Sequence, residues 1–563
     1  ILANGGEIFL TTNAVDELLK GVVNNTGIIE ANSLDGITGK VELFAHGGEV
    51  QVGGTIEAKD GFVETSGDKV KISDDFRVKA DKWLIDPKDF TIAASGGDIT
   101  GATLSSNLEG TDVEIQSVNG ATDGNGDIFV NDTISWNAAT KLTLNAQNDI
   151  FINQSITATN TAGQLALYYG QGAVSSGNTA DYYVKAPINL KAGDNFFTKL
   201  GSDGSETTWK VITDLGSAGS TTGTDLQGIN GNLLGNYVLG ADIDASATST
   251  WNSGAGFNPI GTYFQGNFDG LGHTIDSLFI NRSTSAGLFN KIQGSIISNV
   301  GLTNANITGS SFSGGLVGQM QSNATIKNSY ITGSVNGGTD SYIGGLVGQL
   351  QSGILKNSYS TANVNGNFSV GGLVGQNQSS GTILNSYATS TVTATGTKGG
   401  LVASNSGTVT NSWYDNETNT DTMSDSGLGK TKDEILTAFS GLEAWTAGGG
   451  ASVEGYSTAT ALTLPQLVAF YVSDGEILFA GGFGTQDNPY TITNWTQLQN
   501  INNSNILTQN YYFSLLNNLG SSTSDYTDLA SSTANSGTGW NPIGNGTIKF
   551  TGNFDGNNYN ISN

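Results

Sequence analysis

Cysteine is absent from the 563 residues of this chain. Its absence excludes disulfide bonds, thiolate metal ligands and cysteine nucleophiles. It does not indicate a cytosolic location, because long exported chains that stay unfolded in transit also avoid cysteine.

Basic residues are scarce. The chain has 22 of them, of which only Arg77 and Arg282 are arginine, against 49 acidic residues, and the formal net charge is −27. Without a basic stripe to neutralise phosphates, we expect no binding to nucleic acid or to anionic lipid. The acidity is expected to keep a long, exposed molecule soluble.

Histidine and long apolar runs are also scarce. His46 and His273 are the two histidines and no HExxH pattern occurs, so the sequence predicts no zinc site. No stretch of 18 apolar residues exists, so we expect no membrane span. The start, Ile1–Gly6, shows no signal peptide, which suggests a piece cut from a longer precursor.

Short runs with β-strand alternation make up much of what is present. Charged residues are 13% of the chain, but hydrophobic residues are 37% and recur periodically, which favours an ordered all-β protein over disorder. Alternation places one set of apolar side chains on the same side of successive short strands, namely Val41, Leu43, Val50, Val52 and Ile56. Similar runs occur at 126–130, 142–146 and 149–153. Three short strands per turn, with glycine at the corners, predict a right-handed parallel β-helix, a solenoid, with short helical insertions.

Gly-Leu segments recur at nearly fixed spacing between residues 286 and 402. From Gly315 to Gly345, Gly372 and Gly400 the steps are 30, 27 and 28 residues. An Asn-Ser-aromatic triplet follows each of these four segments, at 328–330, 357–359, 385–387 and 411–413. A period of this size is typical of a solenoid. We expect the asparagines to form an amide ladder and the rings to stack; a sugar-binding stripe is the alternative.

A longer repeat divides the chain. Leu226 is matched by Leu498 and Asp269 by Asp555, offsets of 272 to 286 residues. We therefore expect four regions: coils at 1–200, a repeat module at 201–430, a connector or cap at 431–480, and the start of a second, truncated module at 481–563. Helices are expected at Ala14–Val23, with Asn13 as N-cap, and at Lys430–Phe439.

The first region resembles filamentous haemagglutinin, the adhesin type exported by two-partner secretion. The residues that carry the resemblance, which covers about 5–200, include Ala14–Leu19, Val63–Gly67 and Trp83–Pro87. It implies a secreted bacterial surface protein and an outer-membrane two-partner-secretion transporter as export partner. The secretion domain and signal peptide of that family match nothing in this sequence.

The second region resembles GLUG-repeat modules. Its Gly-Gly-Leu-Val-Gly and Asn-Ser-Tyr pairs match that pattern, as does Phe268–Ile275. Such modules occur as accessory regions in surface adhesins and in some large secreted proteases, so the resemblance implies a place and not a reaction.

Candidate sites are weak. Asp123–Asp127 spaces its oxygens like a calcium loop, but Ile128 and Ile134 stand where Gly and Glu are needed, so a polar turn is expected. Asp269 and Asp276 are the carboxylates considered for glycoside hydrolysis. Asp269 recurs within a repeated turn, which favours a structural role. Four lysines and Asp340 are scattered along the repeats and do not cluster, the lysines being Lys291, Lys327, Lys356 and Lys398.

We therefore expect no catalytic, cofactor-binding or metal-binding residues, and the binding residues stay unknown. The sequence predicts a rigid, secreted stalk at the bacterial outer surface that mediates adhesion to cells, host or biofilm matrix. Its polysaccharide or protein ligand is not identified. The alternatives are a β-helical carbohydrate-active enzyme and a binder of a host protein or nutrient carrier.

Overall fold

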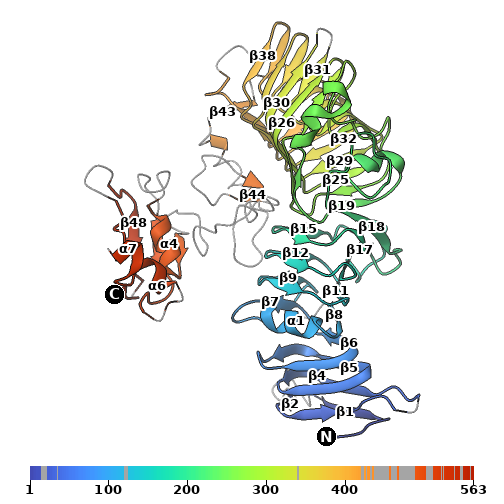
Figure 1. Ribbon diagram of the computed structural model, residues 1–563, viewed down its shortest axis with the longest axis vertical. Helices are drawn as coiled ribbons and strands as arrows, with labels where there is room; N and C mark the ends of the chain where they lie inside the picture. Colours follow the sequence, from blue (N-terminus) through green and yellow to red (C-terminus); the bar gives the residue numbers. More distant parts are fainter. Residues whose placement is uncertain are drawn as a thin grey trace.

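A computed structural model shows how most of the chain is arranged (Figure 1). The structure describes residues 1–13, 22–34, 36–118, 124–338, 341–419, 424–425, 428–431, 434–435, 456–457, 466–467, 489–502, 512–521, 523, 525–537, 539–544, 549–557 and 559–562. Strands make up 49% of the chain and helices 8%, so the predicted all-β character is confirmed.

The longest sheet runs along the whole stack from the N-terminus to residue 410. Its first strands are β1 (Glu7–Asn13), β2 (Val22–Asn25), β3 (Ile28–Glu30), β4 (Lys40–Val52), β5 (Thr55–Ile72), β6 (Arg77–Asp86), β8 (Asp112–Ser117), β11 (Lys141–Ala146), β14 (Gln164–Tyr169) and β17 (Gly193–Leu200). It continues with β18 (Thr207–Ile212), β19 (Tyr237–Leu239), β21 (Phe268–Asp269), β24 (Phe289–Gln293), β25 (Ile296–Ser298), β28 (Val317–Gln321), β29 (Ala324–Lys327), β32 (Val347–Lys356), β36 (Val374–Leu384), β40 (Val402–Asn405) and β41 (Thr408–Thr410).

Two narrower sheets accompany the long one in each half of the stack. In the first half they are β7 (Phe90–Ile92), β9 (Ile128–Val130), β12 (Ile150–Ile152) and β15 (Tyr182–Val184), and β10 (Ile134–Trp136), β13 (Ile156–Ala158) and β16 (Ile188–Asn189). In the second half they are β20 (Ile243–Asp244), β22 (Thr274–Asp276), β23 (Phe279–Asn281), β26 (Gly301–Gly309), β30 (Tyr330–Gly337), β33 (Tyr359–Ser360), β34 (Asn363–Gly366), β37 (Tyr387–Ala388), β38 (Val392–Ala394), β42 (Trp413–Asp415) and β43 (Gly429–Lys430), and β27 (Phe312–Ser313), β31 (Tyr342–Gly344), β35 (Ser369–Gly371) and β39 (Thr397–Gly399).

Neighbouring strands in these sheets pair in parallel with the strand one circuit away. Val347 of β32, for example, lies beside Val374 of β36, and Tyr359 of β33 lies beside Tyr387 of β37. We call each circuit a coil. The apolar set predicted to share one side, which begins with Val41 and Leu43, is buried as expected.

At one step of the stack, two neighbouring strands run in opposite directions. β17 and β18 pair antiparallel, with a bulge, and β19 then pairs parallel to β18. Gly201, at φ +78°, lies in the short loop between them, where a Cβ would lie 2.4 Å from the backbone nitrogen of Ser175. The chain therefore reverses its direction within the long sheet.

The apolar core is divided in the same area. The first cluster consists mainly of residues from Ile8 to Val211, and the second runs from Ile212 to Tyr414. Tyr330, Tyr359 and Tyr387 of the second half pack with the first cluster and so join the two.

A separate small cluster, Tyr490 to Ala530, holds the C-terminal unit together. This unit contains β46 (Tyr490–Ile492), α4 (Trp495–Asn500), β47 (Tyr512–Leu515), α6 (Tyr526–Leu529), α7 (Ala534–Gly537) and β48 (Asn553–Asp555). β47 pairs in parallel with both β46 and β48.

The predicted helices are placed differently. Residues 14–21 lie outside the described residues. Val22 and Val23 open β2, so the predicted C-terminal end of this helix is wrong, whereas the cap at Asn13, the last residue of β1, stays a prediction. The two valines pair with Glu49 and Val50, as β-branched residues favour.

The second predicted helix is only partly described. Lys430 belongs to β43, and Thr431 and Glu434 exchange the reciprocal hydrogen bonds of a capping box at a helical start. Residues 436–439 lie outside the described part. Helix α1 (Gly101–Leu108), which Thr100 caps through its hydroxyl, is not among the predicted helices.

The repeated glycines are required by close packing between coils. A Cβ on Gly372 would lie 2.1 Å from the carbonyl oxygen of Gly400 in the next coil, and one on Gly315 would lie 1.8 Å from Ile331. The following Leu316 and Val317 are fully buried. The Gly-Gly-Leu-Val segments thus let adjacent coils approach while the aliphatic pair fills the core.

Gly372→Ala is expected to lower the stability of the stack by roughly 1–3 kcal/mol or more, because a backbone carbonyl cannot move aside as a flexible side chain can. Gly110→Ala serves as the matched control, since nothing lies within 4 Å of a Cβ there. Calorimetric unfolding of both variants checks the difference. Equal transition temperatures would contradict the packing explanation.

Candidate functional site

The asparagines of the repeats form the predicted amide ladder. Asn299, Asn328 and Asn357 have φ near +50°, the left-handed conformation that asparagine tolerates at a corner. The side-chain amide of Asn328 donates to Asn299 at 3.0 Å, and that of Asn357 donates to Asn328 at 3.3 Å. Asn385 and Asn411 share the same conformation.

The serines and aromatic rings of the triplets also contact the neighbouring coils. The backbone N–H of Ser358 donates to the hydroxyl of Ser386 in the next coil at 3.2 Å. Tyr330, Tyr359 and Tyr387 are buried and stack face to face, with ring centroids 4.8 and 5.0 Å apart. Since the ring faces of these three tyrosines contact one another, they offer no platform for a sugar ring.

A buried polar cluster joins the two halves of the stack. The Asp269 carboxylate accepts hydrogen bonds from the Tyr182 hydroxyl at 2.7 Å, from the Asn299 amide at 3.0 Å and from the Leu271 backbone at 2.7 Å. Burial raises the pKa of Asp269 although these donors oppose the rise. Nearby, Lys327 forms an ion pair with Asp181.

His273 belongs to the same junction. Its Nε2 donates to the carbonyl oxygen of Ile188 at 3.0 Å, and its Nδ1 lies 3.3 Å from the Asp242 carboxylate. Burial opposes ionisation of Asp242, but His273 and Thr274 outweigh it and lower its pKa. The other histidine, His46, is exposed on β4 and packs against the ring of Phe44.

The carboxylates considered for catalysis do not share a site. Asp269 lies in the long sheet, almost fully buried, whereas Asp276 lies in β22 of another sheet. Burial opposes ionisation of Asp276, but hydrogen bonds from Thr303, Ser277 and Asn304 lower its pKa. Each carboxylate instead accepts hydrogen bonds from the next coil, Asp269 from Asn299 and Asp276 from Thr303 and Asn304.

The calcium-like loop is likewise used for structure in its described part. Asp123 and Asp340 lie outside the described residues. The Asp127 carboxylate accepts hydrogen bonds from the Asn148 amide at 2.8 Å and from the Asp149 backbone at 3.0 Å. Within the described ranges, no group of three or more His, Cys, Asp or Glu side chains could hold a metal ion.

An acidic row that the sequence reading missed lies on the outer face of the first coils. Glu64, Leu84 and Glu114 are register partners on β5, β6 and β8, and Asp86 follows on β6. Burial, with added repulsion from Glu64 and Glu114, raises the pKa of Asp86 to about 6. The register places Glu64 and Glu114 on either side of Leu84, and Asp86 lies two residues further along the same strand, beside Ser66.

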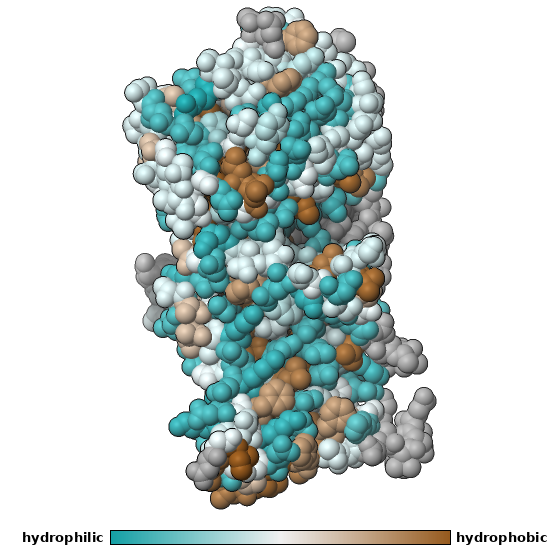
Figure 2. Space-filling view, turned by 90° about the vertical axis from the view of Figure 1, so that its right-hand side faces the viewer, coloured by the Kyte–Doolittle hydropathy of each residue, from teal (hydrophilic) through white to brown (hydrophobic). Residues whose placement is uncertain are grey.

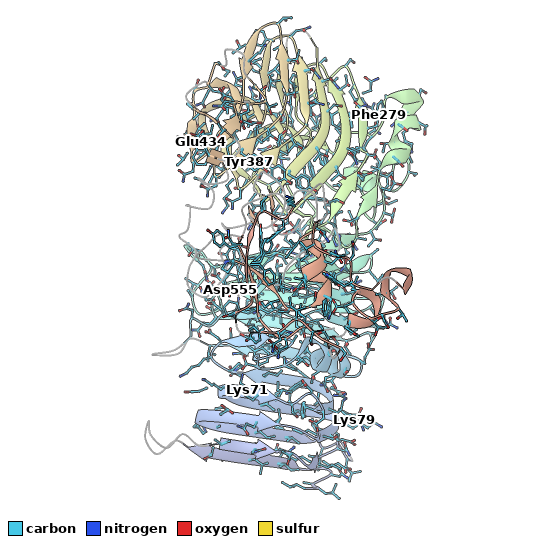
Figure 3. The ribbon with its side chains drawn as sticks, turned by 90° about the vertical axis from the view of Figure 1, so that its left-hand side faces the viewer. Lys71, Lys79, Phe279, Tyr387, Glu434 and Asp555 are labelled. Atoms are coloured by element: carbon cyan, nitrogen blue, oxygen red, sulfur yellow. The ribbon has the colours of Figure 1, made fainter. Side chains whose placement is uncertain are left out.

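Most lysines of these coils form ion pairs with acidic residues. A cleft of about 440 Å³ is lined by Lys71 and Lys88 among others, but Lys71 pairs with Asp98 at 2.7 Å and Lys88 with Asp68 at 2.8 Å. Figure 3 labels Lys79 in the same coils. Its side chain pairs with Glu57. These lysines form ion pairs with acidic side chains of adjacent coils.

The visible surface of the stack is largely polar. Figure 2 shows hydrophilic and neutral atoms with scattered apolar spots, which gather at the N-terminal end. Ile1, Leu2 and Ile28 are exposed at that end. No helix in the described ranges has the length and apolar character needed to cross a membrane.

Two family profiles match parts of the chain. The GLUG motif matches residues 339–365 and 366–393, so the chain carries GLUG repeats. The N-terminal region of the M26 IgA1-specific metallo-endopeptidases matches residues 223–333.

Individual proteins are similar over short stretches. Halomucin from Haloquadratum walsbyi is 42% identical over 127 residues, which are 20% of this chain and 1% of halomucin. A protein from Evansella cellulosilytica, provisionally named a Gly-rich membrane protein, is 35% identical over 99 residues, which are 17% of this chain and 10% of that protein. The chain thus spans only a small part of either relative.

One solved structure is also similar. It is described as a candidate immunoglobulin A1 protease from Bacteroides ovatus and is 21% identical. The match covers 46% of this chain and 92% of that one, with a TM-score of 0.34.

Asn328→Ala is expected to destabilise the second half of the stack more than Asn328→Gly. Both changes remove the ladder hydrogen bonds, but alanine also strains the left-handed corner by about 1–2 kcal/mol. Thermal unfolding of the two variants separates the contributions. If glycine costs as much as alanine, backbone strain plays no part.

Asp86→Asn is expected to raise the transition temperature at pH 7.5 and to leave it nearly unchanged at pH 4. The folded pKa of Asp86, about 6, lies above the ordinary value of 3.8. Its contribution to stability is therefore full below about pH 4 and is lost as the pH rises through 6. Asp81→Asn, on the exposed face of the same strand, is the control for the amide substitution itself. A gain that is equal at both pH values would exclude titration of Asp86 as its cause.

Proposed function

We propose that this chain is part of a secreted bacterial surface protein and acts as a rigid stalk for adhesion. The observation that carries the proposal is that the polar and aromatic side chains of each repeat contact the equivalent side chains of the neighbouring repeats. Asn328, Ser358 and Tyr359 all contact equivalent residues one coil away. Such a stack supplies length and stiffness, and leaves its outward side chains for contact with a ligand.

The coils are proposed to wind as a right-handed parallel β-helix. Parallel pairing at steps near 28 residues, with three sheets around each half, supports this path. The proposed regions are haemagglutinin-like coils at 1–200, a GLUG module at 201–430, a connector at 431–480 and a further module from 481 onward.

A location outside the cell is supported by the GLUG repeats and by the names of the similar proteins, a mucin and a membrane protein. By resemblance to filamentous haemagglutinin, export through an outer-membrane two-partner-secretion transporter is part of the proposal. The ligand is proposed to be a polysaccharide or protein of a host cell or biofilm matrix.

A peptidase is the second candidate, favoured by the match of residues 223–333 to the N-terminal region of the M26 enzymes. A zinc peptidase of the HExxH type needs two histidines four residues apart. This chain has His46 and His273, far apart and in different halves of the stack. We therefore propose a binding role and not a catalytic one for these residues.

The test uses residues 1–563 immobilised on beads and presented to a glycan array and to a panel of bacterial and host cells. Saturable binding is expected, with no reducing sugars or peptides released from the bound material. Beads that carry the heat-unfolded chain are the control. Release of products would favour an enzyme, and failure to bind any glycan or cell would reduce the stack to a spacer.

A further inference from the structure

The C-terminal unit repeats the turns of the second half of the stack in detail. The Asn502 side chain accepts a hydrogen bond from the Gly544 backbone at 2.7 Å, as Asn230 does from Gly261 at 2.8 Å. Asp555 accepts from the Asn557 backbone at 2.8 Å, as Asp269 does from Leu271 at 2.7 Å. The acceptor turns also share a residue at positive φ, +45° for Asn557 and +48° for Leu271.

Strand pairing fixes which residues are equivalent. In the stack, Tyr237 of β19 lies beside Phe268 of β21; in the C-terminal unit, Phe513 of β47 lies beside Phe554 of β48. Phe554 therefore corresponds to Phe268. Counting back through the shared Phe-x-Gly-Asn-Phe-Asp-Gly sequence, Phe550 corresponds to Phe264.

In the stack, these aromatic residues are covered completely by the next coil. Phe264 and Phe268 pack against the ring of Phe289, with ring centroids 5.0 and 5.4 Å away. Phe264 also forms a parallel bridge with Ile292, and Phe268 pairs with Ile297. Residues 286–298 thus form the cover for this face.

In the C-terminal unit, the same face is open among the described residues. Phe554 is 38% exposed and Ile561 47%, whereas their counterparts Phe268 and Ile275 are fully buried. The opening is an apolar groove of about 570 Å³, lined by Trp495, Trp540 and Phe550 among others. Asp555 in Figure 3 marks the strand at its edge.

We propose that this groove binds a β-strand coil of the type of residues 286–298, in parallel register beside β48. Its occupant would place an aromatic side chain over Phe550 and Phe554, as Phe289 lies over Phe264 and Phe268. Branched aliphatic side chains three and eight positions later would fill the rest, as Ile292 and Ile297 do. The inference does not depend on any ligand for the stalk.

The test uses the full chain, residues 1–563, and a fluorescein-labelled peptide with the sequence of residues 284–300. Fluorescence anisotropy is expected to show saturable binding in a one-to-one ratio. A peptide carrying Phe289→Ser, Ile292→Ser and Ile297→Ser should bind at least about tenfold more weakly, because three buried apolar side chains are lost.

Two protein variants give matched controls. Phe554→Ser should weaken binding of the native peptide, whereas Phe368→Ser should leave it unchanged, because Phe368 is also exposed, at 48%, but lies in the second half of the stack. Circular dichroism verifies that both variants are folded. Equal binding of the two peptides, or no binding, would overturn the proposal. So would a concentration-dependent dimer that Phe554→Ser abolishes, since a second copy would then be the occupant.

Discussion

Parallel backbone pairing between coils is the constraint from which the rest of the stack follows. A strand that pairs in register with the strand one circuit earlier places each side chain directly over its counterpart, about 4.8 Å away. This arrangement favours residues whose side chains interact favourably with an identical side chain. Examples are Asn328 on Asn299 and Tyr359 on Tyr330. Like charges repel in the same arrangement, and only 13% of the residues are charged. Some charges meet an opposite charge across coils, as Lys71 meets Asp98, whereas Glu42 lies beside Glu64 and Lys327 beside Lys356.

The contacts between the two halves follow another logic. Here the strand direction reverses, so identical residues do not stack on one another. The two halves are instead joined by specific hydrogen bonds between polar residues. Asp269 holds Tyr182, and His273 holds the backbone of Ile188, across 85 or more positions in sequence. A buried carboxyl group is costly unless it is hydrogen-bonded, so these contacts specify how the halves meet more than they add stability.

The sequence pattern predicted those features of the fold that depend on residues close together in the chain. Alternation identified the inward side of β4, and the recurring Gly-Gly-Leu-Val segments identified the coil period. The reversal at β17 and β18 was not predictable, because the Gly201 loop reads as an ordinary turn whichever way the next strand runs. The Asp269 cluster joins residues whose sequence neighbourhoods are unrelated. The predicted helix at Ala14–Val23 failed at Val22 because valine spacing suits a helix stripe and a strand alike.

The coil path also determines how the molecule would carry load. Strands lie across the long axis of the stack, so a pull on the two ends of the chain opens the pairing between coils one rung after another. Few hydrogen bonds share the force at any moment, and extension would proceed in many small steps instead of one rupture. The Lys327–Asp181 and Tyr182–Asp269 contacts, which link residues 87 or more positions apart, would interrupt this unzipping at the midpoint. In the proposed stalk, this stepwise opening would lengthen the chain gradually under load.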